Sequence, residues 1–453
     1  MQAKKSSMTT DLTSGNVVKQ LVMFALPLFL SNALQAVYNL VDMIVVGNYV
    51  GAAGMSAVST GGETLHLLTF LAMGFSSAGQ VLIAQDVGAG RMDSVRKTIG
   101  TLFTLLMSAS IVMTVVCYVI RGNILSWLNT PADAYGYTMD YTVVCILGLF
   151  FIYGYNAVSA ILRGMGDSKR PFVFIGVAAI LNIILDIWFV KYLGMAAYGA
   201  ALATVIGQGV SFVASIIYLY IKRDKFGFDF KPASFVPQNE TVKKLLALGI
   251  PMAIQSAAVS FSKIVLTAWI NSFDVIYSAL GGVYNKVNMM AGIVSNSFTT
   301  AGSTMVGQNL GAKKYDRVPK VLSTVLWIGT AIFTVCSVAL FLFSDAIFGL
   351  FTSDAAVLAA AGVLVLPTII NFYGSDTRAM AFSIINGSGN TRLNLCVALI
   401  DGLISRMGIA ALLGFALHMD CLGFWLGDAI AGFVPMAIGC IYYFRGNWRK
   451  NLS

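Results

Sequence analysis

The chain repeats itself after 223 positions, in two long blocks of mostly apolar sequence. The segment IAQDVGAGRMDSVRK at 83–97 recurs as VGQNLGAKKYDRVPK at 306–320. The same shift lays RGMGD at 163–167 over NGSGN at 386–390. Two matches that share one offset predict two homologous lobes, each able to form a bundle related to the other.

The composition places both lobes in a membrane. Hydrophobic residues make up 57% of the chain and charged residues only 11%, whereas a soluble domain has about a quarter of its residues charged. Apolar segments of at least about 20 residues can cross the hydrocarbon core. We therefore predict an all-α polytopic membrane protein with twelve transmembrane helices in two six-helix lobes. The predicted spans lie near 17–47, 53–88, 92–121, 132–163, 168–191, 196–222, 241–270, 275–309, 313–343, 353–386, 389–416 and 420–444.

A polar stretch, RDKFGFDFKPASFVPQNE, separates the two blocks and carries two prolines. We interpret it as a linker between the lobes, an arrangement common among transporters. The predicted division is an N-terminal tail at 1–16, an N-lobe at 17–222, the linker at 223–240, a C-lobe at 241–444 and a C-terminal tail at 445–453.

The net charge of +9 reflects the orientation of the chain in the membrane, because most basic residues fall on one side. Twenty-three of the 29 Lys and Arg residues fall in the tails, the linker and the loops after even-numbered helices. Only Arg121 and Lys191 fall in loops on the opposite face. By the positive-inside rule, both termini and the linker are cytoplasmic. Because the charge is spread over short segments, it does not predict a nucleic-acid partner.

Two N-lobe carboxyls lie at similar depth within predicted helices. Counting 1.5 Å per residue from the outer helix ends puts Asp42 about 9 Å and Asp186 about 7.5 Å inside. Asn182 shares a helical face with Asp186, and Thr204 reaches a comparable level. Two carboxyls, an amide and a hydroxyl suit one small cation with oxygen ligands, or a shared proton. The alternative is a buried polar network that only clamps helices together.

The chain resembles the multidrug and toxic compound extrusion (MATE) family over nearly its whole length. The resemblance lies in ALPLFLSNALQAVYNLVDMIVVG, VLIAQDVGAGRMDSVRKTIG, ILRGMGDSKRP, NIILDIWFV, GAALATVIGQ and VGQNLGAKK. It implies that Asp42, Asn182, Asp186 and Thr204 form the cation-coupling site, for H⁺ or Na⁺. Tyr141 and Asn156 would complete the surrounding hydrogen-bond network, Asn156 fitting least well because the helix count places it deeper.

The resemblance further implies a secondary active efflux transporter, in which cation entry drives export of organic, mostly cationic or amphipathic compounds by alternating access. Pro27 is then the expected place for a bend in the first helix. We expect no cofactor, a bacterial or archaeal cell membrane, lipid as the surrounding partner, and a monomer as sufficient. A flippase for lipid-linked oligosaccharides, from the same superfamily, is the alternative, because Lys263, Lys286, Arg378 and Arg406 fall inside C-lobe helices.

Other polar residues in predicted helices have two interpretations each. Gln35 and Glu63 are candidate substrate-binding residues, but Gln35 also suits helix packing and Glu63 a local pair with His66. Asp376 is a candidate substrate or coupling residue. The other interpretation is that Asp376 forms an ion pair with a charged residue of the C-lobe, so that the two charges neutralise each other. The expected members of those pairs are Lys263, Lys286, Asp376, Arg378, Asp401, Arg406 and Asp428.

The sequence does not predict an enzyme. The glycine-rich repeats lack a Walker lysine, and the chain has two histidines and no HExxH motif. Its six cysteines stand singly, without CxxC spacing, and predict neither a disulfide nor a metal site.

Overall fold

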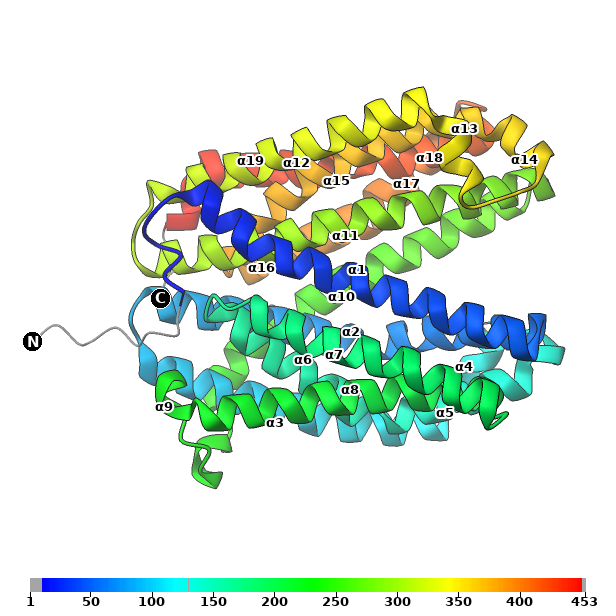
Figure 1. Ribbon diagram of the computed structural model, residues 1–453. Coiled ribbons are helices and arrows are strands. Elements are labelled where there is room, and N and C mark those ends of the chain that lie inside the picture. Colours follow the sequence, from blue (N-terminus) through cyan, green and yellow to red (C-terminus); the bar gives the residue numbers. More distant parts are fainter. Residues whose placement is uncertain (1–9, 129, 450–453) are drawn as a thin grey trace, which may run out of the picture. The chain divides into compact units, whose positions relative to one another are not determined.

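A computed structural model describes residues 10–128 and 130–449, and all the regular secondary structure in these ranges is helical (Figure 1). Residues 1–9 of the predicted N-terminal tail, with Lys4 and Lys5, lie outside the described residues, as do Asn129 and residues 450–453. The predicted all-α fold is confirmed.

Each of the twelve predicted spans is helical. The N-lobe segments are α1 (Val17–Val50), α2 (Ala52–Gly88), α3 (Met92–Val119), the pair α5 (Tyr135–Leu147) and α6 (Leu149–Gly164), α7 (Lys169–Asp186) with η2 (Ile187–Tyr192), and α8 (Ala196–Ile221). The C-lobe segments are α10 (Asn239–Asn271), α11 (Val275–Gly311), α12 (Arg317–Leu342), α14 (Ala355–Ala360) with η4 (Ala361–Leu364) and α15 (Val365–Gly387), α16 (Thr391–Leu399) with η5 (Ile400–Ser405), α17 (Arg406–Ala411) and η6 (Leu412–Ala416), and α18 (Asp420–Ala431) with α19 (Val434–Phe444).

Shorter elements lie at the ends of the spans, in the loops between them and after the last one. They are α4 (Arg121–Trp127), η1 (Ala132–Ala134), α9 (Arg223–Phe226), η3 (Pro232–Phe235), α13 (Ser344–Gly349) and η7 (Asn447–Arg449). Within the described ranges, ten helices are long and apolar enough to cross a membrane, and the bent pair α5–α6 makes an eleventh. The remaining predicted span is α11, which is long enough but carries Lys286 and many Ser, Thr and Asn side chains.

One predicted span is bent. The axes of α5 and α6 differ by 50° on either side of Gly148. A Cβ atom at Gly148 would meet the side chain of Val205 in α8. Glycine therefore allows α8 to approach the bend closely, a constraint that hydropathy does not reveal.

By their contacts, the residues form two compact units. Of the described residues, unit 1 holds 10–11 and 26–253, and unit 2 holds 12–25 and 254–449. The boundaries fall inside α1 and α10, each beside a proline within the helix, Pro27 and Pro251. The lobe limits derived from the repeat and the charges stay a prediction.

The internal repeat is visible in the backbone of both units. After α2, Gly90 has a φ of 71°, and its counterpart after α11, Lys313, has a φ of 57°. Gly166 and Gly389 correspond in the same way, with φ of 86° and 70°. The left-handed conformation ends each helix, since it lets the chain turn into the next one. The glycine-rich motifs therefore form turns that end helices.

The linker packs on unit 1. Phe226 and Phe228 are 2% and 3% exposed and belong to the same core cluster as α3. Thr104 donates a hydrogen bond to the carbonyl of Phe235 over 2.7 Å. A Cβ atom at Gly100 would meet the linker backbone. The stretch that looked polar in sequence is thus held in place by its aromatic residues.

The end of the predicted N-terminal tail is also packed, within unit 2. Leu12 is 1% exposed; its N–H donates to Gln308 Oε1 over 3.2 Å, and its carbonyl accepts from Asn309 Nδ2 over 3.1 Å. Lys314 Nζ donates to the carbonyl of Thr13 over 2.8 Å. These partners belong to the VGQNLGAKK motif, so this repeat motif also anchors the chain before the first helix.

Close packing of α17 and α18 in unit 2 predicts the effect of a single methyl group. A Cβ atom at Gly427 would meet the backbone of Ala410, which cannot rotate away. We expect Gly427→Ala to lower the free energy of unfolding by about 1–3 kcal/mol, as overpacking does. Thermal denaturation of the purified protein in detergent measures this effect.

Gly292→Ala in α11 is the matched control, because a Cβ atom there has nothing within 4 Å. Alanine is the better helix former, so this variant should not lose stability. Equal melting temperatures for Gly427→Ala and the unmodified protein would contradict the packing described.

Candidate functional site

Three helices of unit 1 bring the predicted polar cluster together. Asp42 comes from α1, Asn182 and Asp186 from α7, and Thr204 from α8. Their exposed fractions are 1%, 2%, 0% and 6%, in that order. Gly207 allows this close approach of α8 to α7, since a Cβ atom there would lie 3.1 Å from a backbone oxygen of α7.

Hydrogen bonds join three of the four side chains. Thr204 Oγ1 donates to Asp42 Oδ2 over 3.2 Å. The Asn182 amide, turned so that both of its atoms have partners, donates from Nδ2 to Asp42 Oδ1 over 3.0 Å and accepts from the Thr204 backbone N–H over 3.3 Å. Both oxygens of the Asp42 carboxylate therefore accept a hydrogen bond, from helices that the chain reaches much later.

Asp186 differs from Asp42, although it is equally buried. Within the described residues, no donor reaches either of its two carboxyl oxygens. Its carboxyl faces that of Asp42 closely enough for the two groups to share a hydrogen bond once one of them is protonated. Asp186 ends α7, and the π-helical segment η2 follows at once. Such segments often occur where a helix adapts to a functional site.

The arrangement has one chemical requirement. Two carboxylates buried together cannot both stay charged without a compensating cation, because desolvating each charge costs several kcal/mol. None of the ion pairs formed in the described part of the chain involves Asp42 or Asp186. A single proton, or one small cation held by the carboxyl, amide and hydroxyl oxygens, satisfies the cluster.

The two residues expected around this cluster lie in different settings. Tyr141 is buried in the apolar group of α1, α2, α5 and α8 that adjoins Asp42, and its ring lies against Gly61. Asn156 donates from Nδ2 to the carbonyl of Ile152, one turn earlier in its own helix, over 2.8 Å. Tyr141 therefore borders the site, whereas the amide of Asn156 is used within α6.

Glu63 and His66 lie near enough on α2 for their side chains to interact electrostatically. Both side chains are exposed, and no hydrogen bond joins them in the part of the chain that the structure describes. The His66 ring instead packs edge-on against Phe70, with 5.1 Å between ring centroids. Gln35 is half-buried on α1.

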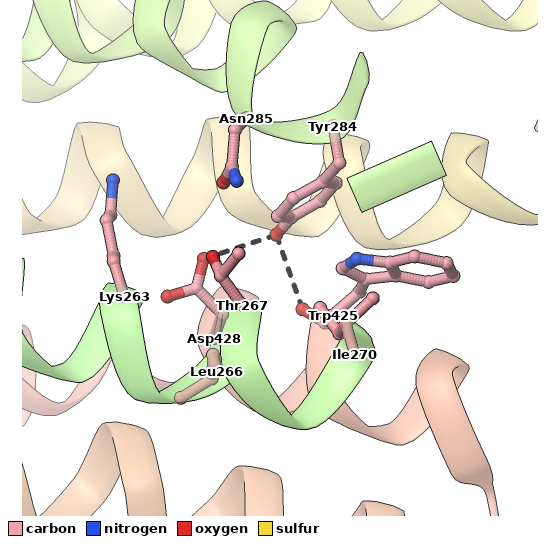
Figure 2. A pocket seen from close by; sticks show the side chains of 8 residues that line it. All are labelled: Lys263, Leu266, Thr267, Ile270, Tyr284, Asn285, Trp425 and Asp428. Carbon is pink, nitrogen blue, oxygen red and sulfur yellow. Dashed lines mark hydrogen bonds between the residues drawn. The ribbon is translucent and has the colours of Figure 1, made fainter. Parts of the chain in front are cut away.

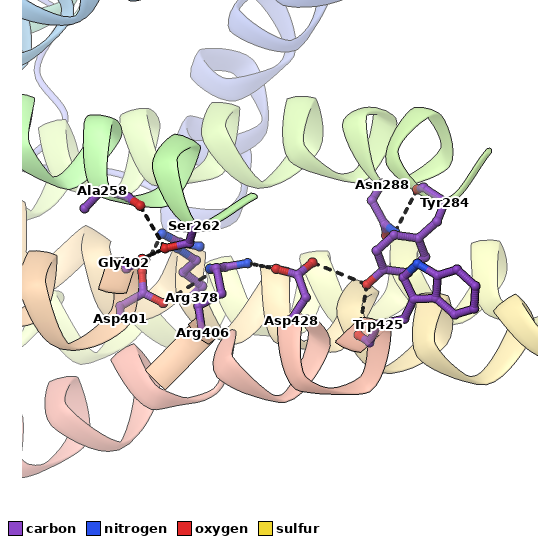
Figure 3. Close-up of polar contacts among 10 residues, drawn as sticks. All are labelled: Ala258, Ser262, Tyr284, Asn288, Arg378, Asp401, Gly402, Arg406, Trp425 and Asp428. Atoms are coloured by element: carbon purple, nitrogen blue, oxygen red, sulfur yellow. Dashed lines mark hydrogen bonds and ion pairs between the residues drawn. The ribbon is translucent and has the colours of Figure 1, made fainter. Parts of the chain in front are cut away.

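Unit 2 contains a chain of ion pairs among the predicted charges (Figure 3). Arg378 lies 2.5 Å from Asp401, and Arg406 lies 3.7 Å from the same carboxylate. Arg406 also pairs with Asp428, whose Oδ2 accepts a hydrogen bond from the Tyr284 hydroxyl over 3.4 Å. These four charges therefore neutralise one another, as was predicted for them.

The other three C-lobe charges depart from that prediction. Among the described contacts, Lys263 and Lys286 take part in no ion pair. Asp376 is 2% exposed and accepts a hydrogen bond from Thr330 Oγ1 over 2.7 Å, with Gly329 leaving room for its carboxyl group. The polar partner of Asp376 is therefore the hydroxyl group of Thr330 and not the cation that was expected.

Tyr284, Trp425 and Thr330 are the polar contacts that sequence reasoning missed. No motif contains these residues, and no spacing relates any of them to its charged partner. Tyr284 and Asp428 (Figure 2) are 144 positions apart, and Thr330 and Asp376 are 46 apart. Only the mutual rotation of the helices brings them together.

Comparisons with known proteins agree on one family. The family model described as MatE matches residues 27–188 and 251–415. The chain is 27% identical to the "Probable multidrug resistance protein YoeA" of Bacillus subtilis, over 99% of this chain and 98% of that protein. It is also 27% identical to the "Probable multidrug resistance protein YpnP" of the same organism, over 97% of each.

A solved structure has the same fold. It is described as the outward-facing conformation of a multidrug resistance MATE family transporter of the MOP superfamily. The match has a TM-score of 0.89 at 21% identity and covers 99% of each chain. At this identity the likeness establishes the fold.

The hydrogen bond from Thr204 to Asp42 predicts a difference between two substitutions. Thr204→Val keeps the shape of the side chain but leaves Asp42 Oδ2 without its side-chain donor. We expect a loss of about 1–3 kcal/mol in the free energy of unfolding, the usual cost of an unsatisfied buried polar group. Thr204→Ser keeps the hydroxyl and should lose less. Thermal denaturation at one pH compares the two, and an equal loss for both would mean that the methyl group matters and the hydrogen bond does not.

Proposed function

Since this chain belongs to the MatE family, the multidrug and toxic compound extrusion (MATE) transporters, we propose that it is a secondary active multidrug efflux transporter. It exports organic, mostly cationic or amphipathic compounds in exchange for H⁺ or Na⁺. It is an integral membrane protein with many apolar helices. It acts as a transporter and not as an enzyme, and a monomer without a cofactor suffices.

The observation that carries the proposal is the isolated carboxyl of Asp186 beside Asp42. Both groups are fully buried, and no donor reaches Asp186 within the described residues. An acid pair of this kind takes up a proton or a small cation at low energetic cost and resists staying empty. Asn182 and Thr204 hold Asp42 in place, and Tyr141 closes the apolar side of the cluster. Asn156 joins the hydrogen-bond network around the acid pair only in a conformation in which its side-chain amide no longer donates to the carbonyl of Ile152.

Cation binding drives transport only if it favours one conformation. A ligand shifts a two-state equilibrium by the difference between its affinities for the two states, and a near-complete shift needs about 5.5 kcal/mol. Asp42 lies on α1, whose first residues are grouped with unit 2 and whose remainder is grouped with unit 1. Pro27 lies next to that change and removes one backbone hydrogen bond. A change of charge at Asp42 therefore acts on a helix that can bend between the two groups.

Three acids or amides outside this cluster are proposed as substrate-binding residues. Glu63 is exposed within a span, where a carboxylate without an ion pair among the described residues suits a cationic compound. Gln35 lies two turns before Asp42 in the same helix. Asp376 has a hydroxyl partner and no cation within the described contacts, so it retains the capacity to bind a positive group.

A lipid-linked oligosaccharide flippase is the second candidate. Lys263 and Lys286 favour it, because cations without ion-pair partners suit a diphosphate. The two arginines do not, since each is already paired with an aspartate. If no gradient drives efflux of organic cations, translocation of a lipid-linked substrate is the activity to measure.

Gradient-driven efflux from proteoliposomes tests the proposal. We expect the unmodified protein to export ethidium under an imposed pH gradient or an imposed Na⁺ gradient. Asp42→Asn and Asp186→Asn should reduce efflux to the level of protein-free liposomes, since a neutral amide neither accepts a proton nor balances a cation. Asp133→Asn, at an exposed position in η1, should export ethidium normally.

Undiminished efflux by both site variants would show that coupling occurs elsewhere in the chain. The effective gradient identifies the coupling ion.

The distribution of basic residues predicts the orientation of the chain in a bacterial or archaeal cell membrane. Both termini and the linker are expected on the cytoplasmic side. A C-terminal green fluorescent protein fusion should therefore fluoresce, and an alkaline phosphatase fusion at the same point should be inactive. Activity of the phosphatase fusion would show that the C-terminus lies on the opposite side of the membrane.

A further inference from the structure

One side of α8 is exposed along the half of the helix that leads into the linker. Apolar side chains recur on it every three or four positions, which places them on one side of an α-helix. Their exposed fractions lie between 37% and 66%. This apolar stripe consists of Val210, Val213, Ile217, Tyr220 and Ile221. Within a membrane span, an exposed apolar stripe of this kind contacts the acyl chains of lipids.

The apolar stripe ends in an aromatic ring and a cation. Tyr220 is the last ring on the stripe, and Cζ of Arg223 lies 5.0 Å from the centroid of that ring. Tyrosine is enriched at the boundary between hydrocarbon and water, and arginine there extends its guanidinium group toward the lipid headgroups. The order along the chain is therefore apolar, aromatic and basic. A phospholipid has the same order of acyl chain, glycerol and phosphate.

Arg96 of α3 lies beside the same turn of the chain. The N–H groups of Gly227 and Phe228 both donate to the carbonyl of Arg223, which closes the single turn of α9. Gly227 has a φ of 66°, and a Cβ atom there would lie 3.2 Å from Nε of Arg96. Glycine therefore leaves room for this guanidinium group next to α9. Two arginines that are far apart in sequence thus belong to one turn.

Neither of these arginines has a strong anionic partner. None of the ion pairs in the described part of the chain involves Arg223. Arg96 pairs with Asp93 over 3.4 Å, but the carboxylate side chain is 91% exposed. An exposed ion pair contributes little, because water and salt screen it. Both guanidinium groups are therefore available to an anion.

The neighbouring segments add further positive charge. Arg170 of α7 belongs to this region, since its Cζ lies 5.7 Å from the centroid of the Tyr218 ring, which in turn packs against Phe226 of α9. Segments 92–98, 167–172 and 222–231 together hold eight basic and four acidic residues. The basic residues are Arg96, Lys97, Lys169, Arg170, Lys222, Arg223, Lys225 and Lys231, and the acidic ones are Asp93, Asp167, Asp224 and Asp229. The excess of positive charge suits an anionic ligand.

We propose that this part of unit 1 binds one anionic phospholipid of the phosphatidylglycerol type. Its phosphate group accepts hydrogen bonds from Arg96 and Arg223, since guanidinium groups bind phosphate oxygens well. Its acyl chain lies along the apolar stripe of α8. A free phosphate would bind the cations but leave the stripe uncovered, so the two features together favour a lipid. The site is distinct from the acid pair, and the proposal does not depend on the efflux function.

Native mass spectrometry of the purified, delipidated protein in detergent tests the site by measuring the affinity for the first bound lipid. Phosphatidylglycerol is compared with phosphatidylcholine that has the same acyl chains. Arg223→Gln and Arg96→Gln each remove one positive charge, whereas Arg223→Lys keeps it. Arg121→Gln is the matched control, because Cζ of Arg121 also lies over a tyrosine ring, 4.4 Å from the centroid of Tyr118 at the other end of α3.

The unmodified protein should bind phosphatidylglycerol about 25-fold more tightly than phosphatidylcholine, since each of two arginines near the phosphate contributes about 5-fold. Arg223→Gln and Arg96→Gln should each lower this preference about 5-fold. Arg223→Lys should retain most of it, and Arg121→Gln should retain all of it. Thermal denaturation establishes that each variant is folded, and if one arginine variant does not fold, the other decides the result.

Equal affinity for the two lipids would overturn the inference, and so would a preference that both Arg223→Gln and Arg96→Gln leave unchanged. Arg223 would then only complement the negative end of the α8 dipole. Glycerol phosphate, added in excess as a soluble headgroup, should leave the binding of phosphatidylglycerol unchanged, because it lacks the acyl chain. Displacement of the lipid by glycerol phosphate would contradict the lipid assignment and identify a site for free phosphate.

Discussion

The cost of burying charge in an apolar setting governs every polar feature of this chain. Each ionisable side chain inside a span has to be paired, neutralised or given a ligand, since an isolated charge there is expensive. The two units meet this requirement differently. Unit 2 pairs two arginines with two aspartates. Unit 1 places two acids together, and no ion pair among the described residues neutralises them.

This difference is greater than the shared ancestry of the lobes would suggest. The backbone turns after α2 and α11 repeat closely, and so do the turns at Gly166 and Gly389. The polar side chains do not repeat, because the offset maps Asp186 onto Ile409. A common scaffold therefore carries an acid pair in one lobe and a network of arginine–aspartate ion pairs in the other. The proposed role in cation coupling follows from the acid pair, which the second lobe does not repeat.

The helices α1 and α10 each have residues in both units. Contacts assign the beginning of α1 to unit 2 and the beginning of α10 to unit 1, and a proline stands near each change. The segments that precede these helices are anchored as well. The residues around Leu12 bind the VGQNLGAKK motif, and the aromatic residues of the linker pack on α3. Each anchor fixes where a helix starts, while the proline leaves its later part able to bend.

The sequence by itself determined the twelve helices, the two homologous lobes and the residues of the acid cluster. Those properties depend on hydropathy, on an offset and on depth along a helix, which are local or additive quantities. Tertiary structure alone decided which charges are paired, because pairing depends on how helices are rotated about their axes. Asp376 thus faces Thr330, Arg406 faces Asp428, and Lys263 faces a cavity. The tertiary structure also decided the bend at Gly148, the π-helical turn after Asp186 and the packing of the linker on α3. Each of these features depends on a close approach between segments that are distant in sequence.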